Sequence, residues 1–416
     1  MRQNLAPSRI LIPLGLAASL SLFGDLTLYT VLVTQLDKVE LSLAAVGVML
    51  SVNRLIRIPA NPLIGKLLDR WGRRRLFIFG MLLGTLTTAS YGMVYGFWPF
   101  LVVRLLWGIA WTCINVGGMA IVLDISTQFN RGRLTGIYNA WLWGGFALAP
   151  LLGGFLVDNI GFRLAMLACA GLTFIGLIVA AVALPETSFR VIEGIQRKSH
   201  QRLNLRYYLR ESLHKIKELL RRKSNLVIVS LLLLITKFAG EGVVLSTTSL
   251  LIQQHFGSTV PLGALTLGIA SAGGMLLALR SLIAGVSGPL TGYLSDSQFG
   301  RWTVIAGSLI FGVIGFGLLS WAPSLVVILL GIVLGAISGG AALTILAAQM
   351  GDLTSSGKEG MTMGVFATIG DIGSAAGPFL AFALLTIVDL QWVYLLCALV
   401  FLVGLMLIGY RRLRGL

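Results

Sequence analysis

Apolar residues in this chain fall into long runs that alternate with short polar connections. A run of about 20 apolar residues is long enough to cross a bilayer as a helix. The pattern predicts on the order of 12 such helices. We place them near residues 10–35, 42–66, 76–95, 97–123, 134–157, 162–184, 226–252, 262–291, 302–321, 323–349, 361–386 and 390–410. The first run is too long for a signal-peptide core and ends without a small-residue cleavage site, so we expect it to remain as helix one.

One long polar stretch, residues 186–225, separates the first six runs from the last six. We therefore expect two six-helix bundles, over residues 1–185 and 226–416, joined by a cytoplasmic linker. Within the linker, "LNLRYYLRESLHKIKELLRRK" sets apolar positions on one helical face against a basic face. This pattern predicts an interfacial helix on the membrane surface, and a solvated linker with helical tendency is the alternative.

The two halves repeat each other at an offset of about 227 residues. "GKLLDRWGRRR" at Gly65 corresponds to "GYLSDSQFGRW" at Gly292, and "GIYNAWLWGGFALAPLLGG" at Gly136 corresponds to "GVFATIGDIGSAAGPFLAF" at Gly364. Parallel six-helix repeats are the plan of a secondary transporter with its site between the halves. The fold expected is an all-α membrane protein of two pseudo-symmetric bundles.

Composition supports this class, because 56% hydrophobic and 12% charged residues do not provide the polar surface of a soluble protein. The formal charge of +16 is a topology signal. If the N-terminus is cytoplasmic, 25 of the 32 Lys and Arg residues lie in inner connections, against two in outer ones. The positive-inside rule then predicts a plasma or inner-membrane protein with both termini cytoplasmic. Anionic lipids are the partners expected for this basic face, and nucleic acid is not expected.

The connection between helices two and three carries a family signature, G-x-L-a-D-r-x-G-r-[RK]. Its matching residues are Gly65, Leu67, Asp69, Arg70, Gly72, Arg73 and Arg74. With "RLLWG" at Arg104 and "LPET" at Leu184, the chain resembles the major facilitator superfamily over nearly its whole length. The resemblance implies that Asp69 holds the halves together on the cytoplasmic side and that Arg73 pairs with Asp124. We call the residues Gly65, Asp69, Arg70, Gly72, Arg73 and Asp124 the conformational latch; a topology signal alone is the alternative.

Helix five is similar to the stretch G-x8-G-x3-G-P-x2-G-G of the antiporter branches of that family. The matching residues are Gly136, Gly145, Pro150, Gly153 and Gly154, and Ala149 replaces one glycine. Small residues let two helices approach closely, and a proline permits a bend. The resemblance implies export by exchange, in the drug/proton antiporter-like branch.

Charged residues inside the predicted spans are candidates for transport chemistry. The cations are Arg54, Arg57, Arg104, Lys237 and Arg280, and the acids are Asp25, Glu241 and Asp371. Each buried charge costs roughly 2.5 to 3.5 kcal/mol on insertion scales, so it must face a partner or a wet cavity. We assign the three acids to proton coupling, because a carboxyl in a partly dry cavity can exchange a proton as the cavity opens. Fixed pairing of Lys237 with Glu241 is the alternative for Glu241.

We assign the five cations to the substrate cavity. Arg54 and Arg57 share a helical face, and a guanidinium can hold a carboxylate or phosphate through two bonds. This indicates an anionic or zwitterionic substrate, unless Arg54 neutralises Asp25 and Arg104 another acid.

No ATP-binding loop, zinc motif or nucleophile elbow is found, so we expect neither an enzyme nor a cofactor or metal site. The function predicted is a monomeric, proton-coupled exporter of small amphipathic or anionic molecules. An uptake symporter or facilitator, and a lipid-translocating membrane protein, are the alternatives.

Overall fold

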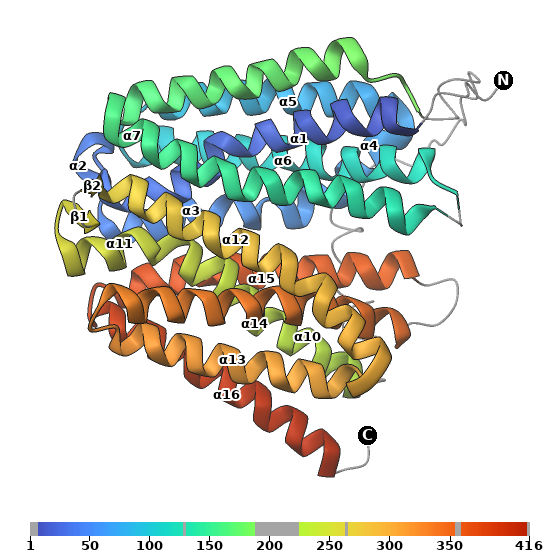
Figure 1. The fold of residues 1–416 in the computed structure, drawn as a ribbon. Coiled ribbons are helices and arrows are strands. Elements are labelled where there is room, and N and C mark those ends of the chain that lie inside the picture. Colours follow the sequence, from blue (N-terminus) through green and yellow to red (C-terminus); the bar gives the residue numbers. More distant parts are fainter. Residues whose placement is uncertain (1–6, 128–129, 188–223, 263–264, 354–358, 414–416) are drawn as a thin grey trace. The chain divides into compact units, whose positions relative to one another are not determined.

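The computed structural model describes residues 7–127, 130–187, 224–262, 265–353 and 359–413 (Figure 1). Its first half contains the helices α1 (Pro7–Val31), η1 (Leu32–Thr34), α2 (Leu36–Val39), α3 (Leu43–Leu55), α4 (Arg57–Trp71), α5 (Arg73–Tyr91), α6 (Phe97–Ile125) and α7 (Arg131–Ala183). Its second half contains α10 (Ser224–Lys237), η2 (Phe238–Val244), α11 (Leu245–Phe256), α12 (Ile269–Leu294), η3 (Ser295–Phe299), α13 (Arg301–Trp321), α14 (Leu325–Asp352), α15 (Glu359–Leu384) and α16 (Leu390–Leu413). The predicted interfacial helix lies outside the described residues.

Ten segments of the described chain are long and apolar enough to cross a membrane. One of them, Arg133–Ala183, holds two of the predicted spans, because Gly161 breaks α7 with a φ of +80° that only glycine adopts readily. The third predicted helix, α5, is not among the ten, and it begins with three arginines.

The described chain is almost wholly helical, and most of its long helices are apolar enough to cross a membrane. The expectation of an all-α membrane fold is therefore confirmed.

Two predicted helices are interrupted in the structure. Helix two is divided at Ile56, where α3 ends and α4 begins. Helix seven passes through the seven-residue π-helix η2, which contains Glu241. Short π-helical segments inside α-helices are frequently found at functional sites.

Helix eight begins later than predicted. The sequence placed its start near residue 262, but β1 (Thr259–Leu262) and β2 (Leu265–Gly268) form an antiparallel hairpin there, and α12 begins at Ile269. Apolar residues of a strand and of a helix are hard to distinguish over so short a stretch, which explains the error.

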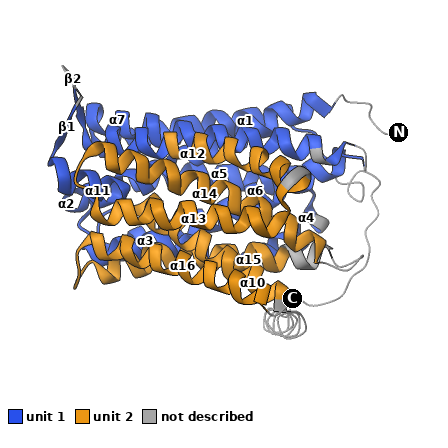
Figure 2. Ribbon diagram, turned by 60° about the horizontal axis from the view of Figure 1, so that its bottom comes forward, with its two compact units in different colours: residues 1–198, 248–278 blue, residues 199–247, 279–416 orange. Residues whose placement is uncertain are grey.

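The described chain divides into two compact units, coloured separately in Figure 2. One comprises residues 1–198 and 248–278, and the other comprises residues 199–247 and 279–416. The first unit thus contains all the described helices of the first half together with most of α11, the hairpin and the beginning of α12.

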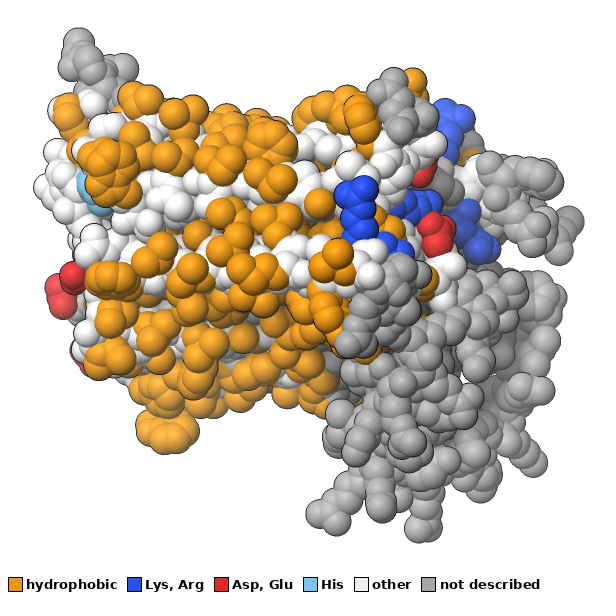
Figure 3. Space-filling view, turned by 90° about the horizontal axis from the view of Figure 1, so that it is seen from below, with side chains coloured by type: hydrophobic (Ala, Val, Ile, Leu, Met, Phe, Trp, Pro, Cys, Tyr) orange, Lys and Arg blue, Asp and Glu red, His pale blue; other side chains and the backbone are white. Residues whose placement is uncertain are grey.

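Apolar side chains cover much of the surface in the view of Figure 3, and many of them are large and exposed. Val182 is 82% exposed, Trp321 76% and Trp98 72%. Such extensive apolar exposure fits a surface solvated by lipid rather than by water.

Candidate functional site

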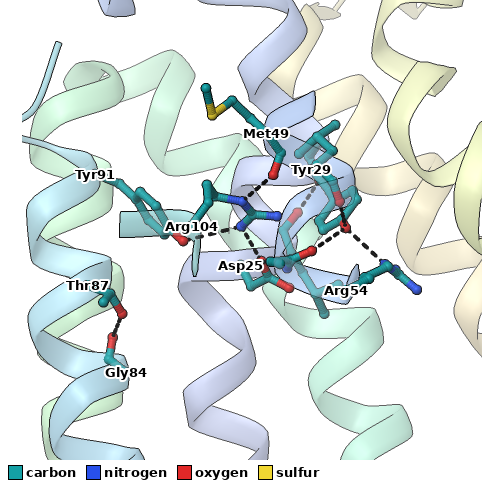
Figure 4. Close-up of polar contacts among 12 residues, drawn as sticks. Asp25, Tyr29, Met49, Arg54, Gly84, Thr87, Tyr91 and Arg104 are labelled. Atoms are coloured by element: carbon teal, nitrogen blue, oxygen red, sulfur yellow. Dashed lines mark hydrogen bonds and ion pairs between the residues drawn. The ribbon is translucent and has the colours of Figure 1, made fainter. Parts of the chain in front are cut away.

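A buried ion pair joins helices one and four in the first unit (Figure 4). Asp25 lies on α1 and Arg104 on α6, and Nη1 of Arg104 is 2.5 Å from Oδ1 of Asp25. Arg104 is fully buried, and its Nε donates to the carbonyl of Met49 at 2.8 Å. The pair meets the condition that charges inside a membrane have partners.

Three further side chains connect this pair to helix two. The amide nitrogen of Asn53 donates to Oδ1 of Asp25 at 3.2 Å, and the hydroxyl of Tyr29 lies 3.3 Å from the amide oxygen of Asn53. Nε of Arg54 donates to the Tyr29 hydroxyl at 2.9 Å. The Tyr29 hydroxyl also lies 2.5 Å from the carbonyl of Leu50, and its single proton can be donated either there or to Asn53. When it is donated to Asn53, the donors point in sequence from Arg54 toward the carboxylate.

Aromatic rings contact both arginines of this network. The guanidinium carbon of Arg54 lies 5.3 Å from the centre of the Tyr29 ring, and that of Arg104 lies 5.4 Å from it. Tyr91 on α5 also contacts Arg104, accepting from Nη1 at 3.3 Å. A ring face attracts a cation, so Tyr29 lets two arginines approach the same region.

The structure gives the predicted cavity cations different surroundings. Arg104, not Arg54, is the partner of Asp25, contrary to the alternative in which Arg54 neutralises this acid. Arg57 lies over the ring of Trp111 at 5.8 Å and is partly exposed. Sequence reasoning did not include Tyr29, Tyr91 or Trp111, because an aromatic residue in an apolar run carries no signal of its own.

In the second unit, Lys237 and Glu241 form an ion pair, which was the alternative prediction for Glu241. Arg280 on α12 reaches this region, since its guanidinium lies 3.2 Å from where a Cβ on Gly240 would stand. Asp371, on α15, is partly buried. The π-helix thus presents Glu241 beside cations of two helices.

The helix-five motif packs against helix one. Gly145 lies against the backbone of Ser19, whose carbonyl would be 3.0 Å from an added Cβ, and Gly153 lies against the side chain of Thr27. Thr27 also donates to the carbonyl of Ala149 at 3.1 Å. Gly136, in contrast, has open space around it.

Other residues of the same motif pack against the beginning of α12, within the first unit. Gly154 lies against the carbonyl of Ala270, and the carbonyl of Pro150 lies against Gly274. A side chain at either glycine would meet backbone atoms of the other helix. Helices five and eight therefore touch through their backbones, which explains why both positions are glycine.

Helix eleven repeats part of this packing in the second unit. Gly373 lies against the carbonyl of Leu234, which would be 2.6 Å from an added Cβ, and Gly377 lies against Gly242. Gly364 has open space, as its counterpart Gly136 does. The internal repeat seen in the sequence is thus also a repeat of helix contacts.

The conformational latch has one predicted contact within the described side chains. Nε of Arg73 lies 3.3 Å from Oδ2 of Asp124. Glu186 of the "LPET" stretch accepts from the backbone nitrogen of Arg73 at 2.8 Å, and Thr187 donates to Asp124 at 3.0 Å. The side chain of Asp69 lies outside the described residues.

A matching contact in the second half was missed from the sequence. Arg301 follows Gly300 as Arg73 follows Gly72, and both glycines have positive φ, of +71° and +94°. Arg301 forms ion pairs with Asp352 and, at 3.7 Å, with Asp296. Asp352 stands at the end of α14 as Asp124 stands at the end of α6, so the repeat offset would have located it.

The described residues contain no group of three or more His, Cys, Asp or Glu side chains able to hold a metal ion.

Comparisons with known proteins agree on the family. The model of the Major Facilitator Superfamily matches residues 14–279 and 270–414. Multidrug resistance protein 1 of Bacillus subtilis is 28% identical over 153 residues, which are 37% of this chain and 39% of the relative. Multidrug resistance protein MdtG of Dickeya zeae is 26% identical over 278 residues, 64% of this chain and 60% of the relative. The chain thus aligns with less than two thirds of the length of each.

A solved structure shares the fold. The bacterial homologue of the human lysosomal transporter Spinster, in its inward-facing and occupied conformation, is 16% identical, with a TM-score of 0.76 over 96% of this chain and 95% of that one. At this level of identity the likeness is one of fold, and the family match extends over most of the chain. The chain belongs to the major facilitator superfamily and resembles its drug-transporter members.

Proposed function

We propose that this protein is a proton-coupled exporter that moves small amphipathic or anionic molecules out of the cell by alternating access. The observation that carries the proposal is the Asp25–Arg104 pair, a carboxylate and a guanidinium bonded to each other inside the membrane. The multidrug resistance relatives and the helix-five motif support export.

The hydrogen-bond chain gives proton binding a route to the substrate side. Ionised Asp25 can only accept, which orients the amide of Asn53 so that its oxygen faces the Tyr29 hydroxyl. We propose that this draws the Tyr29 proton away from the carbonyl of Leu50 and orients Tyr29 toward Arg54.

Protonation removes the negative charge of Asp25 and turns one of its oxygens into a donor, which weakens the bonds that Asn53 and Arg104 donate to it. Arg54 is then held less firmly, and a substrate anion bound near it is released. Removal of a negative charge by itself favours a bound anion, so exchange requires that the loss of Arg54 orientation outweighs this change in charge.

Helix two supplies the proposed contacts with the substrate. Arg57 is partly exposed and backed by Trp111, so it presents a charge beside an aromatic surface. The acid group of an anion can pair with this guanidinium through two bonds, while the Trp111 ring, which is buried, supports the charge from the protein side. Glu241 and Asp371 remain proposed as further proton sites of the second half, with Lys237 and Arg280 beside the cavity.

Accumulation in cells tests the proposal. Cells lacking their own drug pumps are loaded with carboxyfluorescein, an anionic dye, or with ethidium, a lipophilic cation. We expect expression to lower the level of carboxyfluorescein, and Asp25→Asn to abolish this effect at equal protein level. A raised dye level would instead support the uptake alternative. Export of ethidium alone would refute the anionic substrate class.

A further inference from the structure

The end of helix five carries an acid that the transport chemistry above does not use. Asp158 follows Pro150 and Gly154 at four-residue steps, so the three lie along one face of α7. This is the face that touches the beginning of α12. The carboxylate of Asp158 accepts from the backbone nitrogen of Ser271 at 2.7 Å.

Ser271 belongs to the first turn of α12, whose backbone N–H groups have no partner within the helix. A carboxylate at this place caps the helix and faces the positive end of its dipole. The cap is unusual because it comes from another helix, more than a hundred residues earlier in the chain.

The glycine just before α12, Gly268, leaves space for this carboxylate. Gly268, the last residue of β2, lies directly against Asp158, and a Cβ there would collide with both carboxylate oxygens. A side chain at this position would push the carboxylate away from its place beside Ser271. The backbone contacts of Gly154 and Gly274 lie one turn and two turns further along the same line.

We propose that Asp158 is a gating residue of the transport cycle: its bond to the first turn of α12 locks the ends of helices five and eight together. With the N-terminus cytoplasmic, these ends face the outside. The lock has to break for that side to open, and a single partly exposed bond is suited to this because it is weak. This role rests on the alternating access of the proposed function, but not on the substrate or on proton coupling.

Spin-label distances test the lock without any substrate. After replacement of the three native cysteines, labels are attached through Ile160→Cys on α7 and Thr266→Cys on β2, and the purified protein is studied in lipid nanodiscs. Asp158→Ala removes both the acceptor and the charge. We expect Asp158→Ala to shift the population toward molecules in which the two labels are far apart. The ratio of this population to the one with a short label distance should rise about fivefold, which corresponds to the loss of one helix-capping interaction.

Two further variants separate the lock from general damage. Gly268→Ala keeps Asp158 but places a methyl group where its carboxylate lies, so we expect the same rise in the ratio of long to short label distances. Asn159→Ala changes the adjacent exposed residue, which bonds within its own helix, and should leave the ratio unchanged. An unchanged ratio in both Asp158→Ala and Gly268→Ala would overturn the lock. Either result stands whether or not the dyes are transported, so failure of the proposed function is recognised separately.

Discussion

At the scale of the residue, the charges inside the membrane are organised around Asp25. It receives donors from Arg104 and Asn53 at one oxygen, and Arg104 is held in turn by the carbonyl of Met49. Lysine in place of Arg104 would provide fewer donors and no fixed plane for these bonds. The geometry explains why an arginine and an aspartate are found together in an apolar environment.

Loss of both members of the pair should cost less than the sum of the two single losses. Arg104→Gln leaves the buried carboxylate without its cation, and we expect it to lower the free energy of unfolding by about 3–5 kcal/mol. Asp25→Asn combined with Arg104→Gln should be more stable than the two single effects predict, by about 1–3 kcal/mol. Thermal unfolding of the four proteins in detergent measures the difference. Strict additivity would show that the two side chains do not interact.

Arg57 gives the second prediction at this scale. Arg57→Lys keeps the charge but loses the planar, two-bonded grip on a carboxylate, so the apparent affinity for carboxyfluorescein should fall about tenfold. Arg57→Gln should weaken it further. Arg163→Lys, which alters an arginine stacked on Tyr95 near the end of helix five, serves as the control and should have no effect. Normal affinity in both Arg57 variants would rule out this residue as an anion contact.

At the scale of the element, glycine positions in helix five have separate tasks. Gly145 and Gly153 face helix one, Gly154 faces α12, and Gly136 faces open space. One helix thus contacts two neighbours through different faces of a single motif. The motif is a set of close contacts more than a hinge.

This division predicts opposite effects for the same substitution. Gly153→Ala places a methyl group against Thr27, a stiff side chain already bonded to the Ala149 carbonyl, and should destabilise the protein by about 1–3 kcal/mol. Gly136→Ala meets nothing and improves helix propensity, so it should stabilise by about 0.5–1 kcal/mol. Thermal unfolding compares them directly. Equal effects would mean that helix packing does not explain the motif.

Most of the helices and the glycine motif of helix five were predictable from the sequence, because long apolar runs and regularly spaced glycines are local signals. The hairpin before α12 and the π-helix around Glu241 were not, since both depend on tertiary contacts that override local preference. In the site, the Arg73–Asp124 contact was predicted by family resemblance. The Asp25–Arg104 contact was not, because pairing between distant helices needs the fold.

At the scale of the whole molecule, charge distribution predicts the orientation. Thr127, at the end of helix four, should be cytoplasmic, and Asp37, after helix one, should be outside. In a background without native cysteines, we expect Asp37→Cys to react with an impermeant thiol reagent in intact cells, and Thr127→Cys to react only after lysis. The reverse pattern would invert the topology.

The central proposal is that an inward flow of protons drives substrate out through Asp25. Everted membrane vesicles test it most directly, because their interior corresponds to the outside of the cell and can be made acidic. We expect wild-type vesicles to accumulate carboxyfluorescein, and both collapse of the pH gradient and Asp25→Asn to return the dye to its passive level. Accumulation that persists without a gradient, or that is unchanged in Asp25→Asn, would contradict this mechanism.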